Sequence, residues 1–387
     1  MAKLANHNVE WDDARQISYE NASPVSSQMI ELIDSIGRTC ASDLVAKSDL
    51  PPAHTAMMDG YAVAGTGPWK IMGEVRAGQA AFELAPGDAL RVSTGAHIPP
   101  ACSFVIPNED AIIFDGDIAS KVPVPMGKHI RVPGDEAKSG DVIVAAGQKI
   151  TPAAAGLAAS ASIDQIDVRE IPYVDVLVTG DELISSGTAG PGQIRDSLSI
   201  QIPSWVNNVG GQIGQLTRVR DDATETRNAI VSCLAPIIIT TGGTAHGDFD
   251  YVRSALRDLN AQFLIDEINM RPGHPSVLAK LPSGQLVASL PGNPLAAVVG
   301  FLTIVAPAMN RLLGQPLSEL EVSALKQDIE PDRTRVIPVS FSEGKVMPTE
   351  FRGSAMLRGL VSADALAVIK PGTIPGTSTV RLLRLPW

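Results

Sequence analysis

Short apolar runs alternate with helix-like stretches between residues 172 and 315. Residues 173–179 (YVDVLVT) and 237–239 (III) are apolar and rich in β-branched side chains, which is typical of buried parallel strands. Residues 197–209, and the stretch that opens with the capping-box spacing of Asp222 and Glu225, predict helices between such strands. This alternation predicts a three-layer α/β domain with a mainly parallel sheet over residues 172–315.

The segments before and after this domain have a different pattern of apolar, polar and turn residues. From residue 47 to residue 147, short alternating runs such as PWKIMGEVRAG are broken by Gly and Pro, which predicts an inserted β domain. The last segment, residues 316–387, again reads as short strands joined by turns, so a small β domain is expected there.

Two further stretches predict helices outside the α/β domain. The N-terminal one has a helical apolar period formed by Met29, Ile30, Ile33 and Ile36, and it is closed by Gly37. The other, residues 151–163, has Pro152 in its first turn. We expect residues 1–46 and 148–171 to form an N-terminal helical stalk around the inserted β domain.

Composition restricts the classes of partner. The net charge is −11 and the basic residues are scattered, so nucleic acid and anionic membranes are not expected partners. Three dispersed cysteines give neither a disulfide framework nor a cysteine-based zinc site, which fits a reducing compartment. No signal peptide is visible, and the apolar stretch 295–309 is judged too short to span a membrane, so the expected location is the cytoplasm.

The turn after residues 237–239 has the pattern of an anion site. Gly242 and Gly243 end the strand, and a helix with Asp248 and Asp250 in its first turn is predicted to follow. A helix N-terminus behind a glycine loop offers free N–H groups to an anion, and two carboxylates beside it suggest a divalent cation. Asp248 occupies the place where a P-loop requires Lys, and no G-x-G-x-x-G passes through the turn. The plain alternative is a βα turn in which both carboxylates only cap the helix.

Four loops are expected to meet at one edge of the predicted sheet. In an open α/β sheet, ligands bind outside the carboxyl ends of the strands. Polar loops follow three predicted strands, and a fourth lies between the first two; they comprise residues 179–183, 192–197, 240–250 and 290–294. Acidic residues at one strand end are usually helix caps, but four such loops at one edge favour a ligand site.

The order of motifs along the chain resembles the molybdopterin molybdenumtransferases, the MoeA family that includes the gephyrin E domain. The matching segments run through nearly the whole chain: residues 58–63 (MDGYAV), 93–99 (STGAHIP), 130–141, 180–183, 192–197, 242–251, 271–273, 291–294, 353–355 and 363–365. The resemblance implies four parts, in which the α/β domain binds molybdopterin and the C-terminal β domain is a barrel.

The resemblance also implies the reaction and the site residues. The activity would be insertion of molybdenum from molybdate into adenylylated molybdopterin, with Mg²⁺-dependent release of AMP, in molybdenum cofactor biosynthesis. The protein would be a homodimer that works with other proteins of this pathway. The catalytic residues implied are Asp59, Asp181, Glu182 and Asp250, and Asp250 is also the metal ligand. The substrate-binding residues implied are Thr94, Arg131, Asp196, Gly242, Gly243, Asp248, Arg253, Arg271, Pro272, Gly273, His274, Pro291, Gly292, Asn293 and Ser354.

Some positions depart from the family pattern. The family's K-P-G-K-P is R-P-G-H-P here, so Arg271 and His274 replace two lysines, and Arg253 also stands where Lys is usual. Arginine keeps the charge but binds oxyanions through a planar fork, whereas histidine changes its charge near neutral pH. Two other functions therefore stay open at this point: a diverged paralogue that binds a related anionic ligand or partner without turnover, and a nucleotide or pterin phosphohydrolase.

Overall fold

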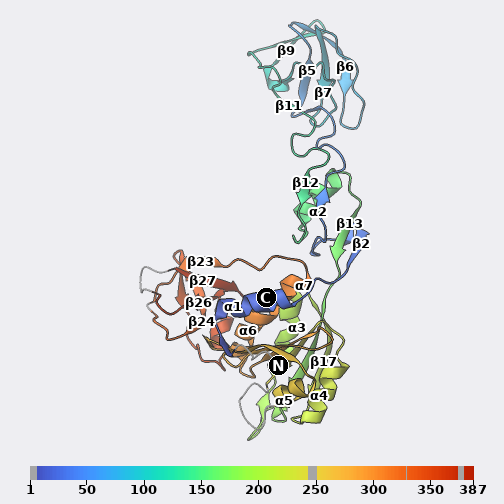
Figure 1. The fold of residues 1–387 in the computed structure, drawn as a ribbon. Coiled ribbons are helices and arrows are strands. Elements are labelled where there is room, and N and C mark those ends of the chain that lie inside the picture. Colours follow the sequence, from blue (N-terminus) through green and yellow to red (C-terminus); the bar gives the residue numbers. More distant parts are fainter. Residues whose placement is uncertain (1–6, 243–250, 328, 374–378) are drawn as a thin grey trace. The chain divides into compact units, whose positions relative to one another are not determined.

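The structure is a computed structural model, and it describes residues 7–242, 251–327, 329–373 and 379–387 (Figure 1). Contacts divide the chain into two compact units. We call residues 1–28 and 169–387 the α/β unit, and residues 29–168 the β unit.

A seven-stranded mixed sheet forms the centre of the α/β unit. Its strands, in spatial order, are β1 (His7–Val9), β19 (Gln262–Ile268), β21 (Val277–Lys280), β22 (Leu286–Leu290), β18 (Ile237–Thr241), β14 (Tyr173–Thr179) and β17 (Gln212–Val219). The pairs β19–β21 and β21–β22 are antiparallel, and the other pairs are parallel. The predicted strands 173–179 and 237–239 are confirmed as β14 and β18.

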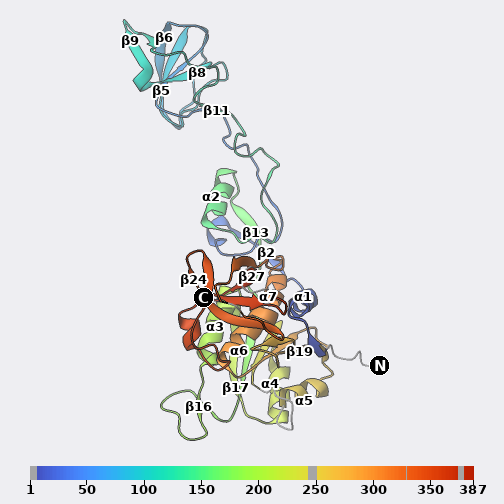
Figure 2. The same cartoon turned by 90° about the vertical axis from the view of Figure 1, so that its left-hand side faces the viewer.

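Helices cover both faces of this sheet (Figures 1 and 2). One face packs against α1 (Trp11–Asn21), α3 (Leu198–Asn208), α6 (Pro294–Gly300), the π-helical turn η3 (Phe301–Val305) and α7 (Ala306–Leu312). The other packs against α4 (Ala223–Ser232) and α5 (Tyr251–Asp258). Along β14, Val176 and Val178 belong to the first core and Leu177 to the second, because successive side chains of a strand point to opposite faces.

Helices α6, η3 and α7 run together as one apolar helix. Pro294–Leu312 spans 19 residues with a mean hydropathy of 1.6, which is long and apolar enough to cross a membrane. Because 83% of it is buried within the structure, it is a core helix. The expectation that this stretch is too short to span a bilayer was therefore wrong, and burial rather than length identifies it.

The C-terminal segment forms a β sheet, as predicted. The spatial order is β20 (Met270–Arg271), β24 (Thr334–Ser342), β26 (Ala365–Ile369), β27 (Thr379–Arg384) and β23 (Glu321–Ala324), with β25 (Lys345–Pro348) paired to β24. A short helix, α8 (Arg358–Val361), follows β25. Strand β20 comes from the predicted α/β domain, so the loop that starts at Arg271 leaves from this sheet.

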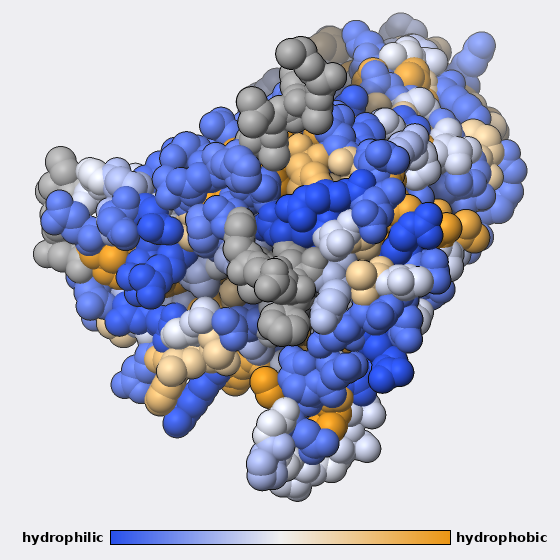
Figure 3. Space-filling model, turned by 60° about the horizontal axis from the view of Figure 1, so that its bottom comes forward, coloured by the Kyte–Doolittle hydropathy of each residue, from blue (hydrophilic) through white to orange (hydrophobic). Residues whose placement is uncertain are grey.

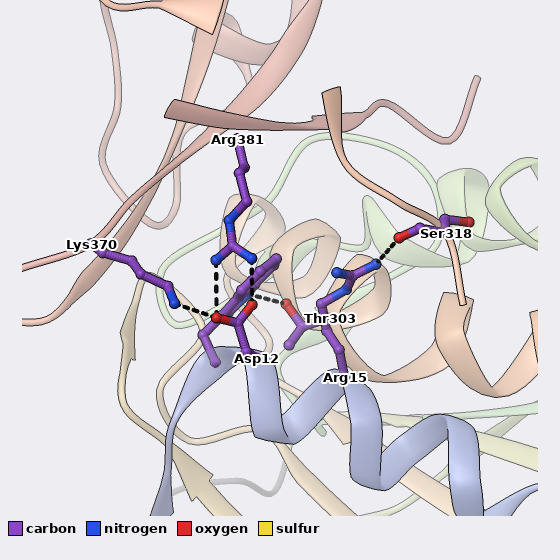
Figure 4. Close-up of polar contacts among 7 residues, drawn as sticks. Asp12, Arg15, Thr303, Ser318, Lys370 and Arg381 are labelled. Atoms are coloured by element: carbon purple, nitrogen blue, oxygen red, sulfur yellow. Dashed lines mark hydrogen bonds and ion pairs between the residues drawn. The ribbon is translucent and has the colours of Figure 1, made fainter. Parts of the chain in front are cut away.

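Helix α1 is tied to the C-terminal sheet by an ionic pair (Figure 4). Arg381 on β27 donates two hydrogen bonds to the carboxylate of Asp12, at 2.7 and 3.1 Å, and Lys370 also pairs with Asp12. Burial by itself raises the pKa of Asp12, but the hydrogen bonds and charges of Arg381 and Lys370 outweigh it and leave the pKa below its ordinary value.

The indole of Trp11 lies beneath these charges. The guanidinium carbons of Arg15 and Arg381 are each 5.1 Å from its ring centroid, and its N–H donates to Oγ1 of Thr303 at 3.0 Å. Arg15 is buried and donates to the carbonyl oxygen of Ser318 at 2.9 Å (Figure 4). We call Trp11, Asp12, Arg15, Lys370 and Arg381 the Asp12 cluster.

The β unit contains a six-stranded sheet, which confirms the β structure predicted for this part of the chain. Its strands, in spatial order, are β8 (Phe104–Pro107), β5 (Gly60–Val63), β7 (Asp88–Val92), β6 (Trp69–Val75), β10 (Asp117–Ser120) and β9 (Ala111–Phe114). A 3-10 turn, η2 (Asn108–Asp110), connects β8 to β9.

Three two-stranded ribbons and one helix complete the β unit. The ribbons pair β2 (Ser27–Glu31) with β13 (Gln165–Arg169), β3 (Leu44–Val45) with β12 (Val142–Val144), and β4 (Thr55–Ala56) with β11 (Ile130–Arg131). Helix α2 (Pro152–Ser160) is capped by Thr151, whose side chain accepts from the N–H of Ala154, as the proline-led pattern predicted.

The predicted helix through Met29 and Ile36 is wrong. Residues 27–31 are strand β2, and a 3-10 turn, η1 (Leu32–Asp34), follows. Met29, Ile33 and Ile36 are exposed, so the apolar period is not a buried helical stripe. Pairing with β13, which is distant in sequence, decides the local structure here, and no local pattern reveals that partner.

Candidate active site

The carboxyl ends of β14, β18 and β22 lie side by side, as predicted for three of the loops. Oγ1 of Thr179 donates to the carbonyl oxygen of Thr241 at 2.6 Å. The N–H of Gly242 donates to the carbonyl oxygen of Leu290 at 2.9 Å. Gly292 lies against Gly242, because a Cβ on Gly292 would be 3.9 Å from the Cα of Gly242. The structure therefore brings together the predicted residues Gly242 and Gly292, and it leaves Gly292 exposed and Pro291 buried.

The loop that carries Ser354 docks on the N-terminus of α6. The carbonyl oxygen of Ser354 accepts from the N–H groups of Leu295 at 3.0 Å and Ala296 at 3.3 Å. Nδ2 of Asn293 lies 3.5 Å from Oγ of Ser354, and both side chains are exposed. Two first-turn N–H groups of α6 are thus satisfied by the Ser354 carbonyl oxygen, and the exposed side chains of Asn293 and Ser354 lie beside this helix end.

The loop from Arg271 to His274 packs against the same helix. Gly273 has φ +99°, and a Cβ there would lie 2.6 Å from Cε of Met270 and 3.4 Å from Cγ1 of Val299 on α6. Only glycine allows this approach. Pro272 and Gly273 are buried and Arg271 is exposed, so the loop packs on α6 through Gly273 and presents the Arg271 side chain to solvent.

His274 is held from two sides. Its Nδ1 lies 2.7 Å from the carbonyl oxygen of Ile268, and its Nε2 lies 3.5 Å from Oε2 of Glu267. The imidazole is about one-third exposed. Glu267, which has an unusual φ of +79°, was not among the predicted site residues, and its sequence position gives no signal of the contact.

Arg253 is buried in an ion pair. It lies on α5 and pairs with Asp266 on β19, whose Oδ2 is 3.2 Å from Nδ1 of His7. This pair joins α5 to the sheet. A role for Arg253 toward substrate stays a prediction.

The loop after β14 carries Asp181 and Glu182, both exposed. It forms a small ribbon from β15 (Leu183–Ile184) and β16 (Ile194–Arg195). The N–H of Asp181 donates to Oδ2 of Asp221 at 3.2 Å. Asp221 was missed, although a signal was present: it follows strand β17 within two residues, in the same position relative to its strand as the predicted acids.

Asp196 caps helix α3. Its Oδ1 accepts from the N–H groups of Leu198 at 3.0 Å and Ser199 at 3.1 Å, and its side chain also accepts from the hydroxyl of Ser199. Ser197 is the N-cap residue of α3 but its side chain makes no capping hydrogen bond, and Asp196 supplies the capping side chain instead. Its predicted contact with substrate is not tested by this geometry.

Three predicted residues, Gly243, Asp248 and Asp250, lie outside the described residues. Helix α5 is described from Tyr251 onward, as expected for the helix after the glycine turn. Within the described part of the chain, no three His, Cys, Asp or Glu side chains gather closely enough to hold a metal ion. The predicted metal ligand Asp250 lies outside this part of the chain.

In the β unit, the structure brings Asp59 and Thr94 together. Oδ1 of Asp59 accepts from the N–H of Thr94 at 2.6 Å and from its hydroxyl at 2.9 Å. These two hydrogen bonds, with a smaller contribution from the charge of Arg91, lower the pKa of Asp59 and favour its carboxylate form. Arg131 is exposed on β11.

The side of the molecule where α4, α5 and the β15–β16 ribbon lie is shown in Figure 3. Hydrophilic residues cover most of this face, and smaller apolar areas lie among them.

Sequence profiles match three consecutive regions of the chain. Residues 9–162 match the MoeA N-terminal region (domain I and II), residues 175–311 the probable molybdopterin binding domain, and residues 325–377 the MoeA C-terminal region (domain IV). The fold and the profiles together define a multidomain α/β protein of the molybdopterin-binding class.

Full-length relatives narrow this class to one family. The chain is 30% identical to the molybdopterin molybdenumtransferase of Synechococcus elongatus, over 90% of this chain and 92% of that protein. It is 27% identical to that of Staphylococcus aureus, over 93% and 90%. A molybdopterin biosynthesis MoeA structure from Pyrococcus horikoshii shares the fold with a TM-score of 0.82 at 22% identity, over 97% of this chain and 99% of the other. The chain belongs to the MoeA family of molybdopterin molybdenumtransferases, which confirms the family and the activity class expected from the sequence.

Proposed function

We propose that the chain inserts molybdenum from molybdate into adenylylated molybdopterin and releases AMP. The observation that carries this proposal is the convergence at one place of the ends of β14, β18 and β22, the loop of Arg271 and the loop of Ser354. A tetrahedral dianion needs cations and hydrogen-bond donors. Asn293 and Ser354 are exposed at the N-terminus of α6, and Arg271 is exposed in the loop that packs on the same helix through Gly273, so these three residues would supply them.

The other predicted residues divide by chemistry. Backbone N–H groups of Gly243, Gly292 and Asn293 suit the phosphoanhydride of the adenylylated substrate, and Gly242, whose N–H is bonded to Leu290, would line the site as a residue without a side chain. The acids Asp181 and Glu182 stand at the end of β14, and the hydrogen-bonded Asp59 of the β unit is kept as a carboxylate. These groups would orient the substrate and accept protons.

Mg²⁺ is part of the proposal because it neutralises charge on a phosphoanhydride. Mg²⁺ is usually held by one or two carboxylates together with substrate phosphates and water. The described acids at this edge, Asp181, Glu182 and Asp221, are oxygen donors of that kind and fit such a sparse ligand set. Asp250 is the proposed ligand.

The resemblance supports the finer architecture as well. We propose a cytoplasmic homodimer with a stalk (residues 1–46 and 148–171), an inserted β domain (47–147), a molybdopterin-binding domain (172–315) and a C-terminal barrel (316–387). Other molybdenum cofactor biosynthesis proteins are the proposed partners. Light scattering at micromolar concentration tests the dimer, and a stable monomer contradicts it.

The activity is tested by AMP release from adenylylated molybdopterin with Mg²⁺, with and without molybdate. AMP release should depend on molybdate, and Asp250→Asn should lower it on the order of 100-fold, the usual loss when one electrostatic group of an active site is removed. The matched control is Asp258→Asn, an exposed aspartate at the far end of α5, which should keep full activity. Release of AMP without molybdate identifies a phosphohydrolase instead, and bound substrate without release identifies a binding protein.

A further inference from the structure

A cavity of about 460 Å³ lies between the core helix and the C-terminal sheet of the α/β unit, and we call it the Arg15 cavity. Its volume is in the range of small-molecule sites in proteins. Its walls come from the end of α3, from η3 and α7, from the segment before β23 and from the end of β27. Asn293 and Ser354 lie at the other end of the core helix, at the N-terminus of α6, so the Arg15 cavity is separate from the strand-end site.

Arg15 lines this cavity although it is only 7% exposed. Its Nη2 donates to the carbonyl oxygen of Ser318, and the ring of Trp11 lies 5.1 Å from its guanidinium carbon. Its Nε has no hydrogen-bond partner in the part of the chain that the structure describes. Figure 4 shows the guanidinium directed toward Ser318 and not toward the carboxylate of Asp12.

The charge of Arg15 is not neutralised by an ion pair with any described residue. Asp12 stabilises this charge through space, but its carboxylate pairs with Arg381 and Lys370. Burial and the charge of Arg381 lower the pKa of Arg15, yet an arginine stays protonated at neutral pH. Buried charges in proteins are normally paired, and a carboxylate is the partner that suits a guanidinium.

The other walls of the Arg15 cavity combine an apolar interior with exposed charges. Leu302 and Leu382 line the cavity and are buried. Glu319 is exposed, and so is the ion pair of Glu321 with Arg384. Because water screens the exposed acids more than the buried guanidinium, the interior attracts one negative charge, while the acids at the opening oppose a second one.

We propose that the Arg15 cavity binds a small organic monocarboxylate. The carboxylate accepts hydrogen bonds from Arg15, and the apolar part of the ligand displaces water from Leu302 and Leu382. Molybdate has no apolar part and carries two charges, so this cavity is not a second molybdate site. The inference does not depend on the proposed function.

The test is a ligand-observed NMR titration of the full-length protein at neutral pH with hexanoate, hexanol and adipate. The three probes have the same chain length and carry one carboxylate, none, and one at each end. Hexanoate should bind about 10-fold more tightly than hexanol, as expected for a hydrogen bond between charged groups. Adipate should bind more weakly than hexanoate, because its second carboxylate meets the acids at the opening.

Two variants locate the binding. Arg15→Gln removes the charge and keeps an amide donor, so the affinity for hexanoate should fall about 10-fold while that for hexanol stays the same. A purely structural role of Arg15 would change both affinities alike. Ala306→Leu keeps Arg15 and fills the cavity from α7 with a good helix former, and it should abolish binding of both probes. This variant keeps the test informative if Arg15→Gln folds poorly.

Arg384→Gln is the matched control. Arg384 also lines the cavity, but it is exposed and paired with Glu321, so its loss should change hexanoate affinity by less than about 3-fold. The inference is wrong if hexanol binds as tightly as hexanoate, if Arg15→Gln keeps the affinity for hexanoate, or if Arg384→Gln loses as much affinity as Arg15→Gln. A wild type that does not bind hexanoate also contradicts it, and the proposed function stands in each of these cases.

Discussion

The α/β unit uses basic side chains in two ways. In the Asp12 cluster, Arg381 and Lys370 are paired with one carboxylate and Arg15 is buried against Trp11 (Figure 4). At the strand-end site, Arg271 is exposed in the loop that packs on α6 through Gly273, and Asn293 and Ser354 are exposed at the N-terminus of that helix. The basic residues of the Asp12 cluster form hydrogen bonds and ion pairs with other parts of the chain, whereas the strand-end residues have donor groups in contact with solvent. In a chain of net charge −11, a local excess of donors of the second kind is what an anionic substrate needs.

His274 lies between these two extremes. It is partly exposed like the strand-end groups, but Ile268 and Glu267 already contact both ring nitrogens. The comparison therefore predicts that substitutions in the Asp12 cluster change stability and leave molybdate binding intact, while substitutions at the strand-end site do the reverse.

The largest effect is expected for Trp11→Ala. The indole is 1% exposed and contacts two guanidinium groups and Thr303, so its loss should lower the free energy of unfolding by about 3–5 kcal/mol. Urea denaturation measures this change. The control Trp387→Ala removes a tryptophan that is 53% exposed, and it should change stability by less than about 1 kcal/mol. Equal losses in both variants contradict the comparison.

Arg271→Ala should cost activity rather than stability. Turnover with molybdate should fall on the order of 100-fold, because a charged donor to the oxyanion is removed. Since Arg271 is exposed, the free energy of unfolding should change by less than about 0.5 kcal/mol. Steady-state AMP release and urea denaturation measure the two quantities. Arg384→Ala, in an exposed ion pair with Glu321, should leave turnover unchanged. If Arg384→Ala lowers turnover as much as Arg271→Ala does, the loss reflects the overall charge of the protein and not the location of Arg271 in the site.

Asp12→Asn should destabilise the protein by about 1–2 kcal/mol at neutral pH, less than a fully buried pair because Asp12 is 37% exposed. The pKa of Asp12 is lowered in the folded state, so its contribution is complete above its ordinary value of 3.8 and fades as pH falls below that value. The difference between wild type and variant, measured by urea denaturation across pH, should shrink in that range. A difference that persists unchanged at the lowest pH would exclude the ion pair as its cause.

The smallest effect concerns Asp59 and Thr94 in the β unit. Thr94→Val removes the hydroxyl donor but keeps the backbone N–H donor, so the pKa of Asp59 should rise part of the way toward its ordinary value. Carboxyl carbon chemical shifts followed against pH measure it. An unchanged titration of Asp59 would show that the hydroxyl contact does not hold the carboxylate.

Local sequence signals located part of the α/β unit, because β14 and β18 are almost wholly buried runs and two helices have capping residues at their starts. Strands β14 and β18 and the capped helices α2 and α4 were found in this way. The stretch through Met29 could not be found, because its structure depends on pairing between β2 and the distant β13.

The site was predictable only to the level of its loops. The rule that ligands lie at strand ends located Gly242, Gly292 and Asp181, and the same rule could have located Asp221. No pattern distinguishes an acid or base that meets a ligand from one that meets its own chain, and Asp196 and Arg253 turn out to have internal partners. Glu267 could not be found, since no sequence pattern signals its left-handed backbone or its contact with His274.

The central claim is that the strand-end loops, and not another basic part of the α/β unit, receive molybdate. A crystal of the protein soaked in molybdate, with anomalous scattering recorded at the molybdenum edge, tests this most directly. We predict one strong peak within contact distance of Arg271, Asn293 and Ser354. A peak beside Arg15, Lys370 and Arg381, or no peak at the strand-end site, would contradict the account.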